Sequence, residues 1–258
     1  MNEKQWKIFS DFKTEFKAKV EQWQKMVPEL KQFQQQIASD NGLSYSVELP
    51  VVYNTDLDKI SRDDRIALIV IGDNPGKNEQ LLQNSCYLVG QAGKLADGFF
   101  KRNPCLNIDF RKNVIILNKT PVHSGKTKQL ELLIKMGGEK VQSLIEETQR
   151  WMAEKTARLH IELFNAAETE EEKTQVWLVG YSELKNKGLF LLYKEELQKA
   201  YEKFPSVWQN VFVYQHFSMN RFSIDLKDFL AEQKNPSDLH QALEKLGSLH
   251  KEEIFGIN

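Results

Sequence analysis

The chain contains four short, continuous runs of apolar residues, and longer segments with helical spacing separate them. The runs are Ile66–Ile71, Val114–Leu117, Val176–Val179 and Val211–Tyr214. They are rich in β-branched and aromatic residues, which is typical of strands that are covered on both faces. The alternation of such strands with helices predicts an α/β fold, a three-layer α/β/α domain with a central, mainly parallel four-stranded sheet.

Helical periodicity predicts most of the remaining elements. Amino-terminal helices are expected within residues 1–45, where apolar residues recur at steps of three and four and Pro28 interrupts or restarts the pattern. Two helices are expected within residues 128–173, between the second and third strands, ending in an exposed acidic turn at Glu168–Glu172. A short helix from about Pro236 to Leu246 completes the prediction.

The chain shows neither an internal repeat nor a low-complexity linker, so we expect residues 1–258 to form a single domain. Apolar residues make up 41% of the chain and charged residues 28%, which is ordinary for a globular protein. The longest apolar runs are far shorter than the ~20 residues of a membrane-spanning helix, and the amino-terminal residues do not resemble a secretory signal. We therefore expect a cytoplasmic monomer with no membrane contact.

Cysteine content and net charge narrow the function classes further. The two cysteines, Cys86 and Cys105, are too few for a disulfide framework or for a four-thiolate metal or iron–sulfur site. The histidines also lack the spacing of a metal site, so we expect no metal and no cofactor. Because the net charge is −1, a nucleic acid would have to be held by a local basic patch.

Polar residues with candidate chemistry follow three of the strands, and ligands of such sheets bind outside the carboxyl ends of the strands. The first strand leads into Gly72-Asp73-Asn74-Pro75-Gly76. Pro75 favours an extended Asn74, and the glycines allow backbone to approach a ligand closely. Either Asp73 or Asn74 is therefore a candidate for holding a water molecule, although a tight turn that caps the next helix is an equally good interpretation.

The second and fourth strands add an amide and an imidazole. Asn118 ends the second strand, and its side chain offers the donor and acceptor that a pyrimidine edge needs, although Asn at a strand end is often only a turn residue. Gly125-Lys126-Thr127 is not a phosphate loop, because Thr120 stands where that motif needs glycine. His216 follows the fourth strand, where it is a candidate for function or a structural histidine. We expect Asn74, Asn118 and His216 to surround one pocket, because all three follow strands that we take to be parallel neighbours.

These fragments together resemble the uracil-DNA glycosylase superfamily over roughly residues 66–220. Gly72-Asp73-Asn74-Pro75-Gly76 is similar to G-I-N-P-G and G-M-N-P-G of the mismatch-specific and single-strand-selective branches, and to G-E-A-P-G of the iron–sulfur branch. Tyr87-Leu88-Val89-Gly90-Gln91-Ala92-Gly93-Lys94-Leu95 is similar to P-F-V-G-R-A-G-x-L of the iron–sulfur branch. His216-Phe217-Ser218-Met219-Asn220 resembles H-P-S-P-L or H-P-S-P-R-N.

The resemblance implies that the chain hydrolyses the N-glycosidic bond of uracil, or of a related deaminated base, in DNA. The catalytic residues it implies are Asn74 or Asp73, which would hold the water, and His216, which would face the base; of the first two we favour Asn74. The implied substrate-binding residues are Gly72, Tyr87, Leu88, Asn118, Ser218 and Asn220, and the implied DNA-binding residues are Met219 and Arg221.

The sequence also departs from the family at three points. Leu88 stands where the family has the aromatic residue that stacks on the base, with Tyr87 one place away. Phe217 replaces the proline of the last motif, and the cysteines of the iron–sulfur branch are missing. A non-catalytic DNA- or nucleotide-binding protein that retains the glycosylase fold is therefore the main alternative. An α/β enzyme that acts on a small molecule is a third class, because fold does not determine function.

Overall fold

The fold is built on four parallel strands, as a computed structural model of the chain shows for residues 1–233 and 238–256. The strand order is β2-β1-β3-β4. The strands are β1 (Leu68–Gly72), β2 (Val114–Asn118), β3 (Gln175–Val179) and β4 (Val211–Tyr214). The prediction of a parallel four-stranded sheet is confirmed, with the first strand beginning at Leu68 rather than at Ile66.

The register brings the carboxyl ends of the strands to one edge of the sheet. Gly72 at the end of β1 pairs with Asn118 at the end of β2. Ile71 pairs with Leu178 of β3, and the next residue of β3, Val179, pairs with Tyr214 at the end of β4. The loops that follow the strands therefore lie side by side at this edge.

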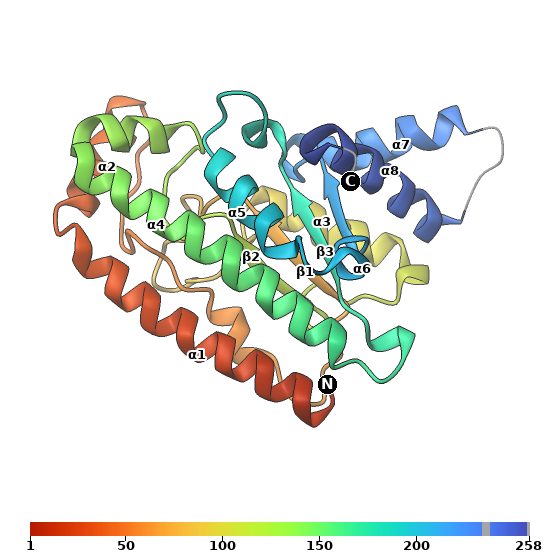
Figure 1. The fold of residues 1–258 in the computed structure, drawn as a ribbon. Helices are drawn as coiled ribbons and strands as arrows, with labels where there is room; N and C mark the ends of the chain where they lie inside the picture. The colour runs from red at the N-terminus through yellow and green to blue at the C-terminus, as the bar shows by residue number, and fades with distance from the viewer. Residues whose placement is uncertain (234–237, 257–258) are drawn as a thin grey trace.

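Helices cover both faces of the sheet (Figure 1). The layer in front of the sheet in Figure 1 contains α4 (Gln129–Asn165) and α5 (Leu191–Tyr201), and α3 (Gln91–Arg102) lies behind the sheet. On that second side, rings of α3 and of α7 (Arg221–Glu232) stack on Trp177 of β3. The arrangement is that of a three-layer α/β/α protein.

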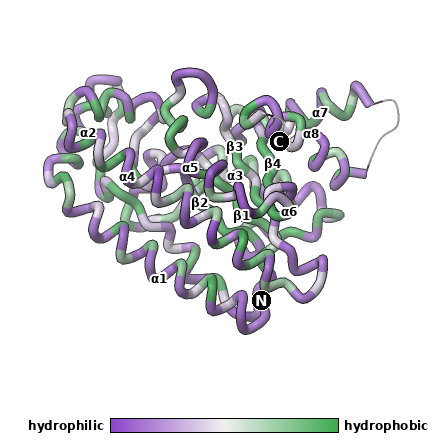
Figure 2. Tube along the Cα trace, in the orientation of Figure 1, coloured by the Kyte–Doolittle hydropathy of each residue, from purple (hydrophilic) through white to green (hydrophobic). Residues whose placement is uncertain are grey.

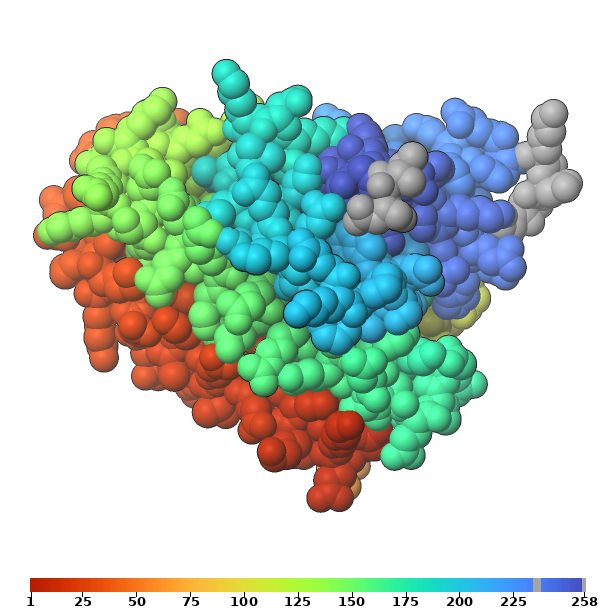
Figure 3. Space-filling model, viewed as in Figure 1, coloured from red at the N-terminus to blue at the C-terminus, as the bar shows by residue number. Residues whose placement is uncertain are grey.

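Two amino-terminal helices, α1 (Glu3–Met26) and α2 (Leu30–Asp40), pack against α4. Figure 3 shows α1 and α4 side by side along the surface, in red and green. As predicted, the break between α1 and α2 lies around Pro28, and α4 consists of two helical segments that meet at Gly138. Gly138 interrupts the helix because its backbone adopts φ 61° and ψ −150°, which non-glycine residues rarely adopt.

The last helix, α8 (Leu239–Phe255), is longer than the short helix predicted from Pro236 to Leu246. Pro236 lies outside the described residues, and the helix begins after Asp238, whose side chain accepts a hydrogen bond from the Gln241 backbone. The helix packs against β4. Its later turns are amphipathic, which the sequence prediction missed.

Short helices connect these elements. They are η1 (Thr55–Lys59), η2 (Pro104–Leu106), η3 (Glu170–Glu172), η4 (Ser182–Leu184), α6 (Pro205–Trp208) and η5 (Ser218–Asn220). The sheet is the apolar centre of the molecule. Apolar and polar residues alternate along the outer helices (Figure 2). Among the described residues, no helix combines the length and the apolar character that a membrane span requires.

Candidate active site

A buried ion pair forms the floor of the site. Asp73 follows β1, and its Oδ1 lies 2.6 Å from the Nζ of Lys119, which follows β2. The Lys119 side chain is fully buried, whereas 16% of the Asp73 side chain is exposed. Burial lowers the pKa of Lys119, and the neighbouring carboxylate of Asp73 opposes this shift. Asp73 is thus held at one oxygen while its carboxylate still reaches solvent.

Asp73 and His216 approach each other over Gly180, the residue that follows β3. A Cβ atom on Gly180 would lie 3.0 Å from Oδ1 of Asp73 and 3.1 Å from Cδ2 of His216. Gly180 also has a φ of +79°, which disfavours any side chain. The absence of a side chain at Gly180 is therefore what lets the carboxylate and the imidazole come together.

His216 presents one ring nitrogen outward. The backbone N–H of Ser218 donates to Nδ1 at 3.0 Å, and the Ser218 hydroxyl lies 2.7 Å from the same atom. Nδ1 is therefore an acceptor, so the neutral ring carries its proton on Nε2. Burial lowers the pKa of His216, and Asp73 partly opposes this shift. Within the described chain Nε2 has no partner, which leaves a neutral N–H donor beside Asp73.

Asn118 lies across the end of β1 from the neighbouring strand. Its Oδ1 is 2.6 Å from the position of a Cβ atom on Gly72, so only glycine permits this placement. The residue is 2% exposed, and its Nδ2 makes no hydrogen bond with any described residue. A buried amide donor without a partner is costly, which marks this atom as one that a ligand would satisfy.

Asn74 points away from this group. Its Nδ2 donates to the Ser124 hydroxyl at 2.9 Å, and Ser124 belongs to the loop between β2 and α4. The turn itself is fixed by the ring of His123, which lies 2.9 Å from the Pro75 carbonyl, and by Glu79, which accepts from the Gly76 backbone. The structure thus brings Asp73, rather than Asn74, next to His216.

The expectation that Asn74, Asn118 and His216 follow neighbouring strands is wrong. β2 and β4 are the two outer strands of the sheet, with β1 and β3 between them. At a spacing of about 4.8 Å per strand the outer strands are roughly 14 Å apart. Asn118 and His216 therefore flank the site from opposite sides, with Asp73 and Gly180 between them.

Tyr87 and Leu88 are both buried. The Tyr87 hydroxyl donates to the Val52 carbonyl at 2.6 Å, and the side chain has no exposed surface. Leu88 is 5% exposed and has a φ of +51°, and its carbonyl accepts a hydrogen bond from Arg111. Gly93 permits this bend, because a Cβ there would lie 1.4 Å from the Leu88 oxygen. As the structure stands, neither side chain offers a stacking surface to a ligand.

The loop after β4 carries the remaining residues of the last motif. Ser218 is half-buried against His216, whereas Met219, Asn220 and Arg221 are exposed, with Met219 at 71%. Met219 and Asn220 adopt left-handed backbone conformations with φ of 53° and 56°. Two adjacent non-glycine residues in this region store strain, which functional loops often do.

Phe217 stands where the similar glycosylase motif has proline, and its buried side chain anchors this loop to the core. It is 1% exposed, and its ring centroid lies 4.7 Å from that of Phe222. Phe222 in turn packs on Phe99 of α3 at 4.9 Å. Packing of this ring into the core therefore takes the place of the backbone restriction that proline would supply.

Exposed cations surround the carboxyl edge of the sheet. They lie in the loops after the strands and in the first turn of the following helices: Lys77, Lys94, Lys126, Lys128, Lys187 and Arg221. None of them forms an ion pair with the part of the chain that the structure describes. The acidic residues of these loops, Asp73, Glu79 and Glu183, are buried or half-buried, and the first turn of α4 adds one exposed acid, Glu131. The edge is thus a local basic patch on a chain of net charge −1.

Sequence reasoning missed two contributors to the site, namely Lys119 and Ser124. The signal available for Lys119 was its position directly after Asn118, the last residue of a strand that is buried throughout. Ser124 gave no signal of its own. Thr127, from the Gly125-Lys126-Thr127 segment, reaches the site weakly, with Oγ1 3.5 Å from Asp73 Oδ2.

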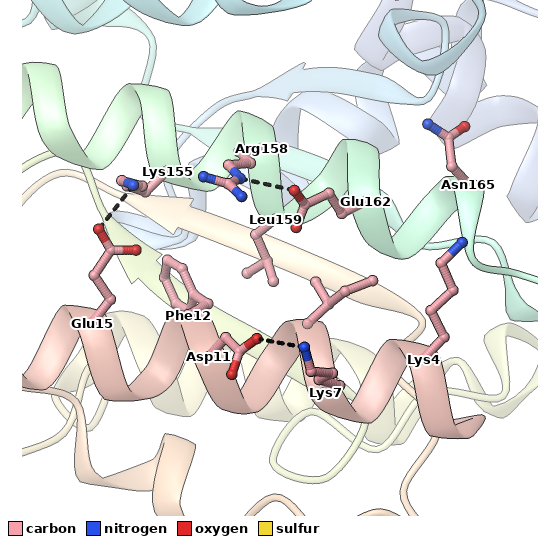
Figure 4. Close-up of a pocket in the computed structure, with 11 residues that line it drawn as sticks. Lys4, Lys7, Asp11, Phe12, Glu15, Lys155, Arg158, Leu159, Glu162 and Asn165 are labelled. Atoms are coloured by element: carbon pink, nitrogen blue, oxygen red, sulfur yellow. Dashed lines mark hydrogen bonds and ion pairs between the residues drawn. The ribbon is translucent and has the colours of Figure 1, made fainter.

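Other features of the described chain do not add to this site. No group of three or more His, Cys, Asp or Glu residues there could hold a metal ion. A groove between α1 and α4 has a volume of about 470 Å³, and its charges pair with each other, as Lys155 does with Glu15 and Arg158 with Glu162 (Figure 4). We assign this groove no part in the chemistry at the sheet edge.

Comparisons with protein-family models, with curated proteins and with solved structures find no match for this chain.

Proposed function

We propose that the chain is a divergent member of the uracil-DNA glycosylase superfamily that hydrolyses the N-glycosidic bond of uracil, or of a related deaminated base, in DNA. The observation that carries this proposal is the meeting of Asp73 and His216 over Gly180. It places a carboxylate beside a neutral N–H donor at the edge of a parallel sheet where ligands bind.

The two groups fit the two demands of the reaction. When the bond between C1′ of the sugar and N1 of uracil breaks, its electron pair stays on the base, and an oxocarbenium-like sugar forms. Nε2–H of His216 would donate a hydrogen bond to the base oxygen on which the negative charge grows. Asp73 would hold the water whose oxygen bonds to C1′ and would accept the proton that this water releases.

Asn118 supports a pyrimidine as the substrate. Its buried Nδ2 has no partner among the described residues, and it could donate to uracil O4 while Oδ1 accepts from N3–H. Cytosine presents the opposite donor and acceptor pattern at these positions. A buried amide in one fixed orientation would therefore discriminate between the two bases.

The basic patch supports DNA as the carrier of that base. Lysine and arginine side chains without acidic partners bind phosphates by releasing counterions. The target nucleotide has to leave the stack to bring its glycosidic bond to Asp73 and His216, which costs a few kcal/mol. Met219, exposed and apolar beside Arg221, would fill the space that the flipped base leaves.

The buried positions of Tyr87 and Leu88 favour the alternative, a non-catalytic DNA- or nucleotide-binding protein on the same fold. Without an aromatic platform the base would be held by its edge alone. Catalysis and binding are separated by His216→Ala, because the charge that His216 meets develops mainly in the transition state.

The test is a single-turnover assay of uracil release together with DNA-binding measurements, both made on wild-type protein and on His216→Ala. We expect His216→Ala to slow release by on the order of a hundredfold or more, with DNA affinity changed by less than about threefold. Release by neither protein, with DNA binding intact in both, would support the binding-protein alternative. Equal losses of release and affinity would assign His216 to ground-state contact.

A further inference from the structure

Lys119 is more deeply placed than any other charged residue of the site. It follows β2 directly, and its side chain passes under the end of β1 to reach β3. Nζ lies 2.6 Å from Asp73 Oδ1, 2.8 Å from the Val179 carbonyl and 3.3 Å from the Gly180 carbonyl. The ammonium group can donate three hydrogen bonds, so these acceptors satisfy it fully.

Stability alone gives no reason for a charge at this position. Removing an ammonium ion from water is costly, and replacing a buried ion pair by apolar residues is often neutral or stabilising. Packing would also favour an apolar residue, because the Phe190 ring centroid lies 5.4 Å from Nζ. What the lysine does instead is hold its carboxylate partner, Asp73, in position.

The two oxygens of Asp73 differ as a result. Oδ1 is bound by Lys119, whereas the only side-chain contact of Oδ2 within the described chain is Thr127 at the long distance of 3.5 Å. Both oxygens lie near the Cβ position on Gly180, Oδ1 at 3.0 Å and Oδ2 at 3.2 Å, so both are on the side of His216. One oxygen is thus held by Lys119, and the other has no short hydrogen bond within the described chain.

We propose that Lys119 is a positioning residue for base excision: it fixes Oδ1 of Asp73 and thereby aims Oδ2 at the attacking water. This inference rests on the proposed function, because it assigns Asp73 the water. It goes further in naming the residue that orients the carboxylate and the oxygen that acts. Lys119 itself touches neither the base nor the sugar.

The lysine also acts on the imidazole. Its positive charge lowers the pKa of His216, in addition to the larger effect of burial. Removing that charge makes the imidazole of His216 easier to protonate. The acid limb of the activity profile should therefore move to higher pH.

The competing role for a buried lysine in such a site is that of a nucleophile, which would attack C1′ and form a Schiff base with the opened sugar. That role requires an accessible Nζ, and the Lys119 side chain is fully buried among Asp73 and the ends of β1 and β3. Borohydride reduction during the reaction should therefore trap no protein–DNA adduct. A trapped adduct that Lys119→Met abolishes would overturn the proposal.

The kinetic test compares wild-type protein with Lys119→Met and Lys119→Arg. Methionine keeps most of the volume but removes the charge and the donors. We expect Lys119→Met to lower kcat at least tenfold, to leave KM within about threefold, and to shift the acid limb of the activity profile to higher pH. Lys119→Arg, which retains the charge, should recover part of kcat and keep the wild-type acid limb.

A double-mutant cycle with Asp73→Asn tests whether Lys119 acts through Asp73. In the Asp73→Asn background, Lys119→Met should cause no further loss of kcat. It should also raise the urea midpoint above that of Asp73→Asn alone, because the single variant leaves a buried ammonium ion without its countercharge. This second readout does not depend on activity, so it remains informative if the proposed reaction is wrong.

The outcomes separate the two claims. If wild-type protein releases no uracil, the proposed function fails, while the coupling in the urea midpoints still tests the pair. If wild-type protein is active and Lys119→Met matches it, or if the two substitutions multiply their effects on kcat, the positioning role is overturned. If Lys119→Met does not fold, Lys119→Arg alone is compared with wild type. An acid limb of Lys119→Arg that lies at higher pH than that of wild type would then contradict the proposal.

Discussion

The side-chain oxygen of Asn118 lies over the backbone of Gly72, 2.6 Å from the position that a Cβ atom on this glycine would take. Gly72→Ala should therefore displace the Asn118 amide. Gly76 lies in the same turn, but a Cβ there would meet nothing within 4 Å, so Gly76→Ala is a matched control.

We expect Gly72→Ala to slow uracil release by on the order of a hundredfold, since a displacement of about 1 Å at a reacting centre can have that effect. Gly76→Ala should stay within about threefold of wild type. Both rates come from single-turnover release assays, with circular dichroism to monitor folding. Equal effects of the two substitutions would show that the Asn118 placement does not matter.

Asn118→Asp tests the identity of the base. The substitution removes the N–H₂ donor that has no partner in the described structure. The variant should lose its preference for uracil over cytosine, because only the amide matches the uracil edge. The measurement is the ratio of uracil to cytosine release from matched oligonucleotides. An unchanged ratio in an active variant would remove Asn118 from base recognition.

The basic patch predicts how DNA binding depends on salt. Replacing Lys126, Lys128 and Arg221 together by Gln should reduce the magnitude of the slope of log K against log salt concentration by about two to three. Each phosphate contact with duplex DNA contributes about 0.9 to that magnitude. The control is Lys112→Gln with Lys203→Gln. These exposed residues precede β2 and β4 and therefore lie toward the opposite edge of the sheet.

The control pair should leave the salt slope unchanged. If both sets of substitutions reduced the slope equally, DNA would bind through overall charge rather than through the edge with the active site. Fluorescence anisotropy with a labelled oligonucleotide at several salt concentrations measures both slopes.

Two buried histidines predict acid sensitivity of the fold. Burial lowers the pKa values of His123 and His160 to about 4. Between pH 6.5 and 4 the unfolded chain therefore binds more protons than the native chain, so the free energy of unfolding falls as pH falls. From pH 7 to pH 5 the loss is on the order of 2 kcal/mol for each histidine.

His160→Gln isolates one of these contributions. The ring of His160 contacts Tyr201 and the Thr174 carbonyl, both at 2.8 Å, so the variant should be less stable than wild type at pH 7. Its own part of the pH dependence should disappear. Urea unfolding at pH 7 and pH 5 gives the comparison, and an equally steep loss in the variant would show that His160 is not a source of the acid sensitivity.

The strands could be predicted from sequence because each is a continuous apolar run that ends at a polar residue or a glycine. The same patterns placed Asp73, Asn118 and His216 at one edge of the sheet. Their grouping depends on strand order, which the chain does not encode locally. The order β2-β1-β3-β4 put Asn118 and His216 on opposite sides.

The choice between Asp73 and Asn74 also depends on tertiary contacts. Lys119 binds Asp73 from below the sheet edge, and Ser124 draws Asn74 toward the loop after β2. Neither partner is close in sequence. Tyr87 is similar, because its burial follows from a hydrogen bond to the distant Val52 carbonyl.

Analysis of the products from a uracil-containing oligonucleotide tests the central claim most directly. The full chain is incubated with single- and double-stranded forms, and free base and abasic DNA are quantified by mass spectrometry alongside Asp73→Asn and His216→Ala. We predict equal amounts of free uracil and abasic sites with wild-type protein and a large loss with each variant. Intact DNA in every sample, with folded protein that binds the oligonucleotide, would contradict the account.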